Sequence, residues 1–349
     1  MKKLKHFLTL IITLITCFNF IFLACGCGGN YYIENFICFS SPVRIETDVN
    51  LKKEELKEIT AYMAYLENDL SVDIINSSTY KFNSSKGNQS LTYSDDFKTV
   101  LTLASDLYNL TKKNFNVAVY PLALLWKFTS KTYNKAEFSL PSEEDIQSIL
   151  PLTDFSQIDT INFTKTKDDI KVDLGGIAKG YALDKVSTML KSFGVKSGYI
   201  NVGSSSLYLV STNGLGIVHP RNTGTQIITI NKNLKDTFVS TSGDYQRYYL
   251  ENNVRYSHIL DTKTGYPTNT GIVSATIIGN GGAKTDAIST ALCLMTKEEI
   301  IEQFNKLYGE YQFFATYINP ENDKDKCIIT NANKKDFTLH DKTFNVIFI

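Results

Sequence analysis

Apolar residues recur at helical spacing in several stretches of the chain. Within residues 52–70, one side of the predicted helix is apolar and the opposite side is charged. The apolar side consists of Leu56, Ile59, Met63, Leu66 and Leu70. Similar spacing predicts further helices at 94–111, 178–193, 286–295 and 298–307. A short helix is also expected after Ser142, whose hydroxyl can cap its first turn.

Short alternating stretches predict β-strands elsewhere. Strands are expected near 36–46, at 158–164 and at 169–174, whereas the polar residues 76–90 are expected to form a loop. A series of short strands follows at 199–202, 207–210, 216–218, 226–230, 238–242, 255–260 and 272–278. Residues 311–349 are again strand-like. Because strands and helices do not alternate regularly, the pattern favours an α+β fold of mixed or antiparallel sheets flanked by helices.

The first 24 residues have the pattern of an export signal. A basic start is followed by an apolar run from Phe7 to Ala24 and then by Cys25. Residues 22–25 resemble a bacterial lipobox, which predicts cleavage before Cys25 and lipid attachment to its thiol. An uncleaved membrane helix and simple secretion are the alternatives, and all three place the remaining chain outside the cytoplasm. We therefore expect a signal peptide at 1–24, a lipidated Cys25 and tether at 25–45, and one domain at 46–349.

Composition narrows the functional classes. The 349 residues include 36 Lys+Arg and 36 Asp+Glu, so the formal net charge is zero. A protein that binds nucleic acid by neutralising phosphates needs a basic excess, which this chain lacks. The six cysteines show no spacing typical of zinc ligands, and Cys293 lies in an apolar helical pattern that predicts a core position.

Residues 172–181 form the first motif that could carry chemistry. The sequence VDLGGIAKGY predicts a strand, a two-glycine turn and the start of a helix. Glycines let a ligand approach the backbone closely, and the free N–H groups at a helix start favour a phosphate. A tight structural turn would explain the same residues, since the segment is neither a P-loop nor a GxGxxG fingerprint.

Asp286 and Thr290 form a second motif. They are four residues apart in a predicted helix, so their oxygens lie on one face. A carboxylate and a hydroxyl are hard-oxygen ligands, which suit Mg²⁺ together with waters and ligand phosphates. The structural alternative is that Thr285 caps the helix and Asp286 interacts favourably with the helix dipole.

Three further segments have both a functional and a structural interpretation. His258 ends a predicted strand before a turn and could accept a proton from a hydroxyl nucleophile, or it could be structural. Residues 240–245 could form a binding loop or an ordinary polar turn. The indole of Trp126 could stack on a flat ring or pack in the core.

The order and spacing of these motifs resemble the FAD:protein FMN transferase (ApbE) family. The matching segments are 173–184 (DLGGIAKGYALD), 201–203, 241–245, 258–267 and 285–291, with 115–126 upstream. The similarity extends from about residue 45 to near the C-terminus. Three positions depart from the family pattern: Asn116-Val117 and Asp261-Thr262 replace Asp-Pro pairs, and Ser204 replaces a second glycine.

The resemblance implies a T-fold-like catalytic domain that transfers FMN from FAD to a Thr or Ser hydroxyl of an extracytoplasmic acceptor protein and releases AMP. It implies Mg²⁺ held by Asp286, Thr290 and the main-chain carbonyl of Gly176. It implies contacts from Asp173 and Lys179 to FAD, and His258 as a candidate base. The flavin or adenine pocket would be lined by Tyr80, Leu124, Leu125, Trp126, His258 and Ile259.

Three other functions compete with this interpretation. An FAD pyrophosphatase would use water in place of the acceptor hydroxyl. A flavin-binding lipoprotein without catalysis would not need the metal ligands, and a solute-binding lipoprotein would show two alternating α/β lobes.

Overall fold

The computed structural model describes residues 31–322 and 324–349. The predicted leader and the predicted lipidation site at Cys25 lie outside these residues. Among the residues described, none of the helices combines the length and the apolar character needed to span a bilayer.

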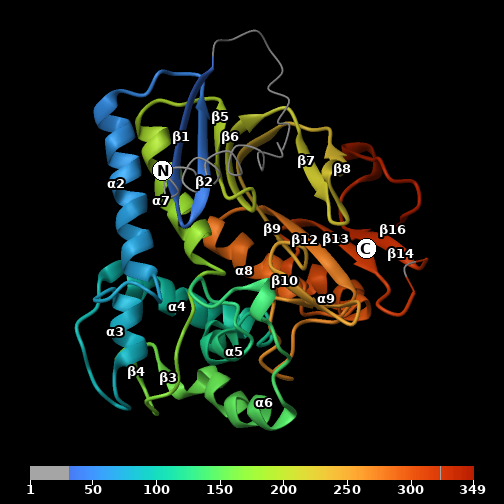
Figure 1. Ribbon diagram of the computed structural model, residues 1–349. Coiled ribbons are helices and arrows are strands. Elements are labelled where there is room, and N and C mark those ends of the chain that lie inside the picture. Colours follow the sequence, from blue (N-terminus) through green and yellow to red (C-terminus); the bar gives the residue numbers. More distant parts are fainter. Residues whose placement is uncertain (1–30, 323) are drawn as a thin grey trace, which may run out of the picture.

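A nine-stranded sheet forms the centre of the molecule (Figure 1). Neighbouring strands run antiparallel, except that β14 and β16 are parallel. In spatial order the strands are β1 (Tyr32–Cys38), β2 (Ser41–Thr47), β5 (Gly198–Val202), β6 (Ser206–Thr212), β9 (Leu234–Gly243), β12 (Ile272–Gly279), β13 (Gln312–Ile318), β14 (Lys326–Thr330) and β16 (Asn345–Phe348). The largely antiparallel sheet confirms the predicted α+β class.

Three small sheets complete the β-structure. They are β15 (Phe337–Leu339), β8 (Asn222–Ile230) and β7 (Leu215–His219); the hairpin β10 (Tyr248–Glu251) and β11 (Val254–Ser257); and the pair β3 (Ile158–Asp159) and β4 (Thr164–Lys165). Apolar side chains of β7 and β8 pack on β6 and β9, so the three-stranded sheet covers one face of the central sheet.

Helices cover the opposite face of the central sheet and one end of the molecule. They are α2 (Lys53–Leu70), α3 (Ser78–Ser84), α4 (Asp95–Leu110), α5 (Tyr120–Leu125), α6 (Glu143–Ile149), α7 (Ala178–Ser192), α8 (Gly282–Leu292) and α9 (Lys297–Tyr308). Helices α2 and α7 share a core with β2, β5 and β6, and α8 and α9 share one with β12 and β13. Helices α3 to α6 gather at the bottom of Figure 1.

Strands β1 and β2 occupy residues that we expected to form a tether. β1 pairs along its whole length with β2, which in turn pairs with β5. Cys38, Val43 and Ile45 are buried beneath α2 and α7. The strand expected near 36–46 is confirmed, but it is a hairpin of two strands, and residues 32–35 of the expected tether already belong to β1. As an edge strand, β1 exposes residues on both faces, which hides the two-residue period on which the prediction relied.

Two other predictions need correction near the N-terminal helices. The expected loop at 76–90 contains helix α3, whose start is capped by the Ser77 hydroxyl accepting the Tyr80 N–H at 2.8 Å. The strand expected at 169–174 is not formed, because Asp169 lies in a turn and residues 170–174 belong to no sheet. Instead, the side-chain amide of Asn83 bonds the N–H and the carbonyl of Val172 at 2.7 and 2.8 Å. A side chain thus replaces a neighbouring strand.

The predicted helix at 286–295 begins four residues early, at Gly282, with Gly281 as its N-cap. Thr285 and Asp286 therefore lie inside α8, and the alternative in which Thr285 caps this helix is wrong. Strand β10 was missing from the predicted series. The remaining predicted helices are confirmed within one or two residues, and Cys293 is fully buried as expected.

Candidate functional site

Helices α7 and α8 meet at two glycines in backbone contact. A Cβ added to Gly180 would lie 2.0 Å from the carbonyl oxygen of Gly282. Asp184 of α7 accepts hydrogen bonds from the N–H groups of Gly282 and Ala283 at 2.5 and 3.0 Å. Burial raises the pKa of Asp184, and these two N–H bonds oppose the rise. The first turn of α8 is thereby fixed to α7.

The Asp286 carboxylate is held by two other elements. Its Oδ2 accepts the N–H of Gly180 at 2.7 Å, and its Oδ1 accepts the hydroxyl of Ser206, the first residue of β6, at 2.7 Å. The residue is only 6% exposed. Each carboxylate oxygen keeps further acceptor capacity, so the group can bind a cation without breaking either bond.

Thr290 lies one turn further along α8, beside the glycine turn. Its hydroxyl is 3.1 Å from the Ser242 hydroxyl of β9 and 3.2 Å from the Asp286 carbonyl. A Cβ added to Gly176 would lie 3.9 Å from Thr290 Oγ1 and 3.2 Å from the Phe115 ring. The fold therefore brings the Gly175-Gly176 turn against the face of α8 that carries Asp286 and Thr290.

The donor chemistry of this cluster fits a hard divalent cation. In the part of the chain that the structure describes, no three His, Cys, Asp or Glu side chains are grouped to hold a metal. The predicted set instead combines one carboxylate, one hydroxyl and one main-chain carbonyl. Mg²⁺ commonly takes few protein ligands and fills its other positions with waters and substrate phosphates. The residues present therefore fit Mg²⁺.

Asp173 and Lys179 flank the same turn. Asp173 Oδ1 accepts the Gly175 N–H at 2.8 Å, and the Lys179 ammonium donates to the Gly175 carbonyl at 3.4 Å. Burial raises the pKa of Asp173, whereas the Gly175 hydrogen bond and the charges of Arg247 and Lys179 lower it. Among the described residues, neither Asp173 nor Lys179 forms an ion pair with another side chain, so both charges remain available beside the turn.

His258 sits near these charges at the end of β11. Its backbone N–H and its Nδ1 both bond the Arg247 carbonyl, at 3.0 and 3.2 Å. A carbonyl only accepts, so we assign the proton to Nδ1, which leaves the Nε2 lone pair free. Burial, followed by the positive charges of Arg247 and Lys179, lowers the pKa of His258 to about 4. The imidazole is therefore neutral at neutral pH.

Arg247 is the residue that the sequence analysis missed. Its charge acts on both Asp173 and His258. Arginine occurs only at positions 44, 221, 247 and 255. Arg44 pairs with Glu46 at 2.9 Å and Arg221 with Asp244 at 2.6 Å, whereas Arg247 has no such partner among the described residues. The scarcity of arginine was the signal that could have identified it.

The predicted aromatic and apolar lining is only partly exposed. Trp126 is 1% exposed, and its Nε1 donates to the Gly265 carbonyl at 2.9 Å. Its ring stacks against Tyr256 with the centroids 5.7 Å apart. The indole is therefore packed in the core of this region, and its contact with the flavin stays a prediction. Ile259 is also buried, while Leu124 is exposed and Leu125 and Tyr80 are half-buried.

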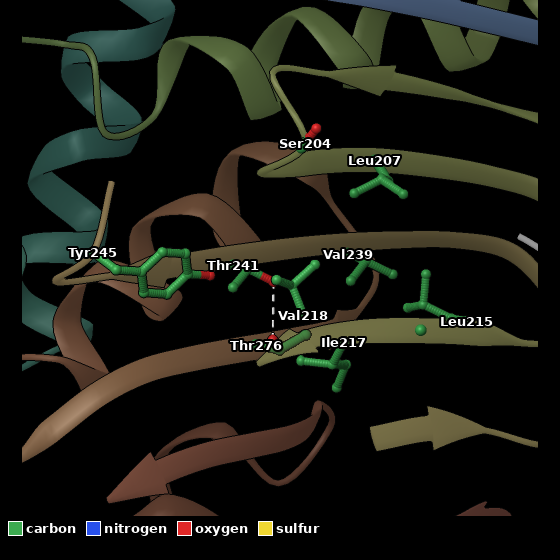
Figure 2. A pocket seen from close by; sticks show the side chains of 10 residues that line it. Ser204, Leu207, Leu215, Ile217, Val218, Val239, Thr241, Tyr245 and Thr276 are labelled. Carbon is green, nitrogen blue, oxygen red and sulfur yellow. Dashed lines mark hydrogen bonds between the residues drawn. The ribbon is translucent and has the colours of Figure 1, made fainter. Parts of the chain in front are cut away.

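The segment at 240–245 includes the last residues of β9, and side chains of this strand end project from both of its faces. Ser240 and Ser242 bond Thr285 and Thr290 of α8 at 2.9 and 3.1 Å. Val239 and Thr241, which alternate with them, instead line a cavity between the central sheet and β7, shown in Figure 2 with the bond between Thr241 and Thr276. This cavity holds about 30 Å³, room for about two waters. Apart from Thr241 and Tyr245 of this segment, none of the residues predicted to bind FAD or Mg²⁺ lines it.

A second cavity, of about 190 Å³, lies beside two of the positions that depart from the family pattern. Asn116 and Thr262 both line it, and the Asn116 side-chain amide donates to the Thr262 hydroxyl at 3.0 Å. The two departures therefore contact each other. Neither of the two cavities includes Gly176, Asp286 or Thr290.

Comparisons with known proteins find relatives of this chain. The profile of the ApbE family matches residues 41–314. The FAD:protein FMN transferase of Vibrio cholerae is 27% identical over 248 residues, covering 69% of this chain and 73% of that protein. The enzyme of the same name from Escherichia coli K12 is 26% identical over 297 residues, covering 77% and 81%.

Solved structures show the same fold. The ApbE protein of Thermotoga maritima superposes with a TM-score of 0.72 and 28% identity, covering 82% of this chain and 94% of that chain. The flavin transferase ApbE from Vibrio cholerae superposes with a TM-score of 0.76 and 23% identity, covering 88% and 99%.

Proposed function

The chain belongs to the ApbE family, and we propose that it is an FAD:protein FMN transferase. The proposal is carried by one observation: the Gly175-Gly176 turn lies against Thr290 on the helix face that also presents Asp286. Hard-oxygen donors beside a glycine turn and a helix start suit a pyrophosphate. Relatives that carry this name in Vibrio cholerae and Escherichia coli support the same activity.

In the proposed reaction, the hydroxyl oxygen of an acceptor Thr or Ser attacks the FMN-side phosphorus of FAD. A new P–O bond forms to the acceptor, and the bond to the AMP oxygen breaks. AMP leaves with that electron pair, and the hydroxyl proton passes to a base. We propose that the acceptor is an extracytoplasmic protein.

The chain's own residues would bind the pyrophosphate and stabilise the charge that develops on it. Asp286, Thr290 and the Gly176 carbonyl would hold Mg²⁺, which supplies positive charge next to the phosphate oxygens. Lys179 and Arg247 place two further cations near the turn. Pre-arranged charges and N–H groups of this kind usually supply the largest part of phosphoryl-transfer catalysis.

His258 would accept the proton at Nε2. Its pKa of about 4 makes it a weak base in the free protein. The charges of Arg247 and Lys179 contribute to that low value, so bound FAD, which is anionic, would offset them and raise the pKa. The base would thus strengthen when substrate is in place.

We also propose that the protein is lipid-anchored at Cys25 and faces the outside of the cell membrane. The support is the sequence of residues 1–25, which lie outside the described structure. Cys25→Ser should release the protein from the membrane fraction. Retention of that variant in the membrane would instead identify residues 7–24 as an uncleaved anchor.

The decisive experiment uses detergent-solubilised full-length protein with FAD, with and without Mg²⁺, and an acceptor peptide that contains one Thr. A matched peptide with Val at that position controls for attachment elsewhere. AMP release and peptide mass are followed together. AMP with an FMN adduct on the Thr peptide only would establish the transferase.

Two other outcomes would replace the proposal. AMP with free FMN and no adduct on any acceptor would indicate an FAD pyrophosphatase. FAD binding without AMP release would indicate a flavin-binding lipoprotein.

A further inference from the structure

The segment that leads into the glycine turn has no strand on either side. Residues 168 and 169 form a turn after β4, and residues 170–173, which follow it, belong to no sheet. Buried backbone N–H and carbonyl groups need partners, and a sheet normally supplies them. Here side chains and the backbone of other segments supply the partners. Asp173 N–H, for example, donates to the Val117 carbonyl at 2.8 Å.

Lys165 supplies two of these partners. Its side chain is 1% exposed, and its ammonium donates to the carbonyls of Asp168 and Ile170 at 2.9 and 2.8 Å. The third proton goes to the carbonyl of Asn83 at 3.0 Å. Every donor of the group is therefore used on backbone oxygens, and no carboxylate pairs with it.

Such a buried cation is costly unless its bonds are complete. The charge of Lys171 lowers the pKa of Lys165, and the charges of Asp168 and Asp169 raise it, so these effects partly cancel. The Phe82 ring centroid lies 5.6 Å from the ammonium nitrogen. Burial lowers the pKa of Lys165 to about 8. A methionine of similar length would avoid this penalty, so the lysine is explained by the three carbonyls that it joins.

Asn83 supplies the next two partners along the same segment. Its amide bonds both the N–H and the carbonyl of Val172, while its own carbonyl accepts from Lys165. Lys165 and Asn83 are thus directly linked, and together they bond residues 168, 170 and 172. Residues 170 and 172 are alternate positions of the kind that a neighbouring strand would bond. Asp168 lies in the turn that precedes them.

Helix α3, which carries Asn83, is itself anchored at its other end. Asp69 of α2 accepts the N–H and the hydroxyl of Ser78 at 3.1 and 2.7 Å. Asp69 also accepts the hydroxyl of Ser94, the N-cap of α4. The position of residues 170–173 is therefore set by a chain of bonds that starts in the helical layer.

We propose that Lys165 and Asn83 are positioning residues that replace a missing strand and place the Gly175-Gly176 turn against α8. The inference rests on the proposed function, because its consequence is that they set the position of the Gly176 carbonyl in the metal shell. Neither residue belongs to the set proposed to bind Mg²⁺ or FAD. They act through Val172, three residues before Gly175, where the turn begins.

The test compares Lys165→Met and Asn83→Leu with Lys171→Met in full-length protein. The first two variants have side chains of similar shape that cannot make the backbone bonds. Lys171 is a partly exposed lysine of the same segment with no hydrogen bond or ion pair among the described residues. Hydrogen exchange of the amides of residues 170–176 is measured alongside thermal unfolding. Apparent KM values for Mg²⁺, FAD and the acceptor peptide are measured separately.

We expect faster exchange at 170–176 in both variants, with exchange in β6 unchanged. The KM for Mg²⁺ should rise roughly 10- to 100-fold, the usual effect of removing a group that orients a metal ligand. The KM for the acceptor peptide should stay within about twofold, because the proposed role acts on the metal ligand alone. If Lys165 and Asn83 had only a structural role, the variants would lose thermal stability, but the KM for Mg²⁺ would not rise selectively over the KM for the acceptor peptide.

The outcomes separate failure of this inference from failure of the proposed function. Wild-type exchange and wild-type Mg²⁺ dependence in either folded variant would overturn the positioning role. If the wild-type protein shows no transferase activity, hydrogen exchange at residues 170–176 still tests the positioning role, because that measurement requires no turnover. Should Lys165→Met fail to fold, Asn83→Leu decides alone.

Discussion

The two sides of the candidate site are built from opposite kinds of side chain. The metal side, which comprises Gly176, Gly180, Gly282, Asp286 and Thr290, consists of small or polar residues at helix ends in backbone contact. The aromatic side consists of Trp126, Phe138, Tyr249, Tyr256 and Tyr266, next to His258. On the first side hydrogen bonds fix the position of each atom. On the second side the packing is spread over several stacked rings.

This difference predicts how each side tolerates change. On the metal side, a Cβ added to Gly180 would lie only 2.0 Å from a carbonyl oxygen, which leaves no room for adjustment. Stacked rings make several partial contacts, so the loss of one is shared among the others. We expect substitutions on the metal side to reduce turnover sharply and those on the aromatic side to reduce mainly stability.

The largest effect is expected from Asp286→Ala. It removes the only carboxylate in the proposed metal shell, and it leaves the Gly180 N–H and the Ser206 hydroxyl without their acceptor. Mg²⁺-dependent AMP release should fall at least roughly 100- to 1,000-fold. Steady-state AMP assays over a Mg²⁺ series check this.

Thr290→Ser and Thr290→Val provide the matched control on the same helix face. The serine variant keeps the hydroxyl and should retain most turnover, whereas the isosteric valine should not. Full activity in Asp286→Ala would show that Asp286 is not a Mg²⁺ ligand, and the expected difference between the metal side and the aromatic side would then have no support.

Gly180→Ala should be the next most damaging change. Its methyl group would collide with the Gly282 carbonyl and push α8 away from α7. The overpacking should lower the free energy of unfolding by about 1–3 kcal/mol, despite alanine's higher helix propensity, and should reduce turnover as well. Denaturant unfolding and AMP release measure the two effects.

Gly224→Ala is the control, because a Cβ there meets nothing nearer than 3.9 Å. Equal stability and turnover in the two variants would mean that the contact between the helices is looser than the structure shows.

Protonation of His258, next to the aromatic side, should make the stability of the folded protein depend on pH. Its folded-state pKa of about 4 lies below the ordinary value of 6.5. The unfolded chain therefore binds more protons between these values, so the folded state should lose stability as the pH falls from 6.5 towards 4. Stability above pH 6.5 should not depend on this group.

Thermal unfolding of the wild type and of His258→Gln across this range tests the expectation. The wild type should lose more stability on acidification than the variant, whereas the exposed His340→Gln should follow the wild type. Parallel curves for wild type and His258→Gln would show that the imidazole titrates normally.

The smallest effect on turnover is expected from Trp126→Phe. The change keeps a ring in the stack but removes the Nε1 bond to the Gly265 carbonyl. Stability should fall by about 1–3 kcal/mol, because a buried carbonyl loses its donor. Turnover should stay within about twofold. A large loss of FAD affinity would show that the indole contributes to flavin binding, and the aromatic side would then not differ from the metal side in this respect.

The sequence alone predicted the regular parts of this protein. Long amphipathic helices such as α2 and α4 are predictable because burial of one face forces a 3.6-residue period on the residues. The placement of Asp286 and Thr290 on one helix face follows from the same period and does not depend on where the helix begins. The family resemblance rested on the local order of such motifs.

Only the tertiary structure decided how those motifs meet. The edge strand β1, the segment held by Lys165 and Asn83, and the location of Trp126 in the core all depend on partners far away in the chain. Arg247 likewise acquires its role from being brought near Asp173 and His258. Local periodicity records which face of an element is buried, but it does not record which distant group covers that face or bonds its backbone. That choice is made by packing and hydrogen bonding across the whole fold.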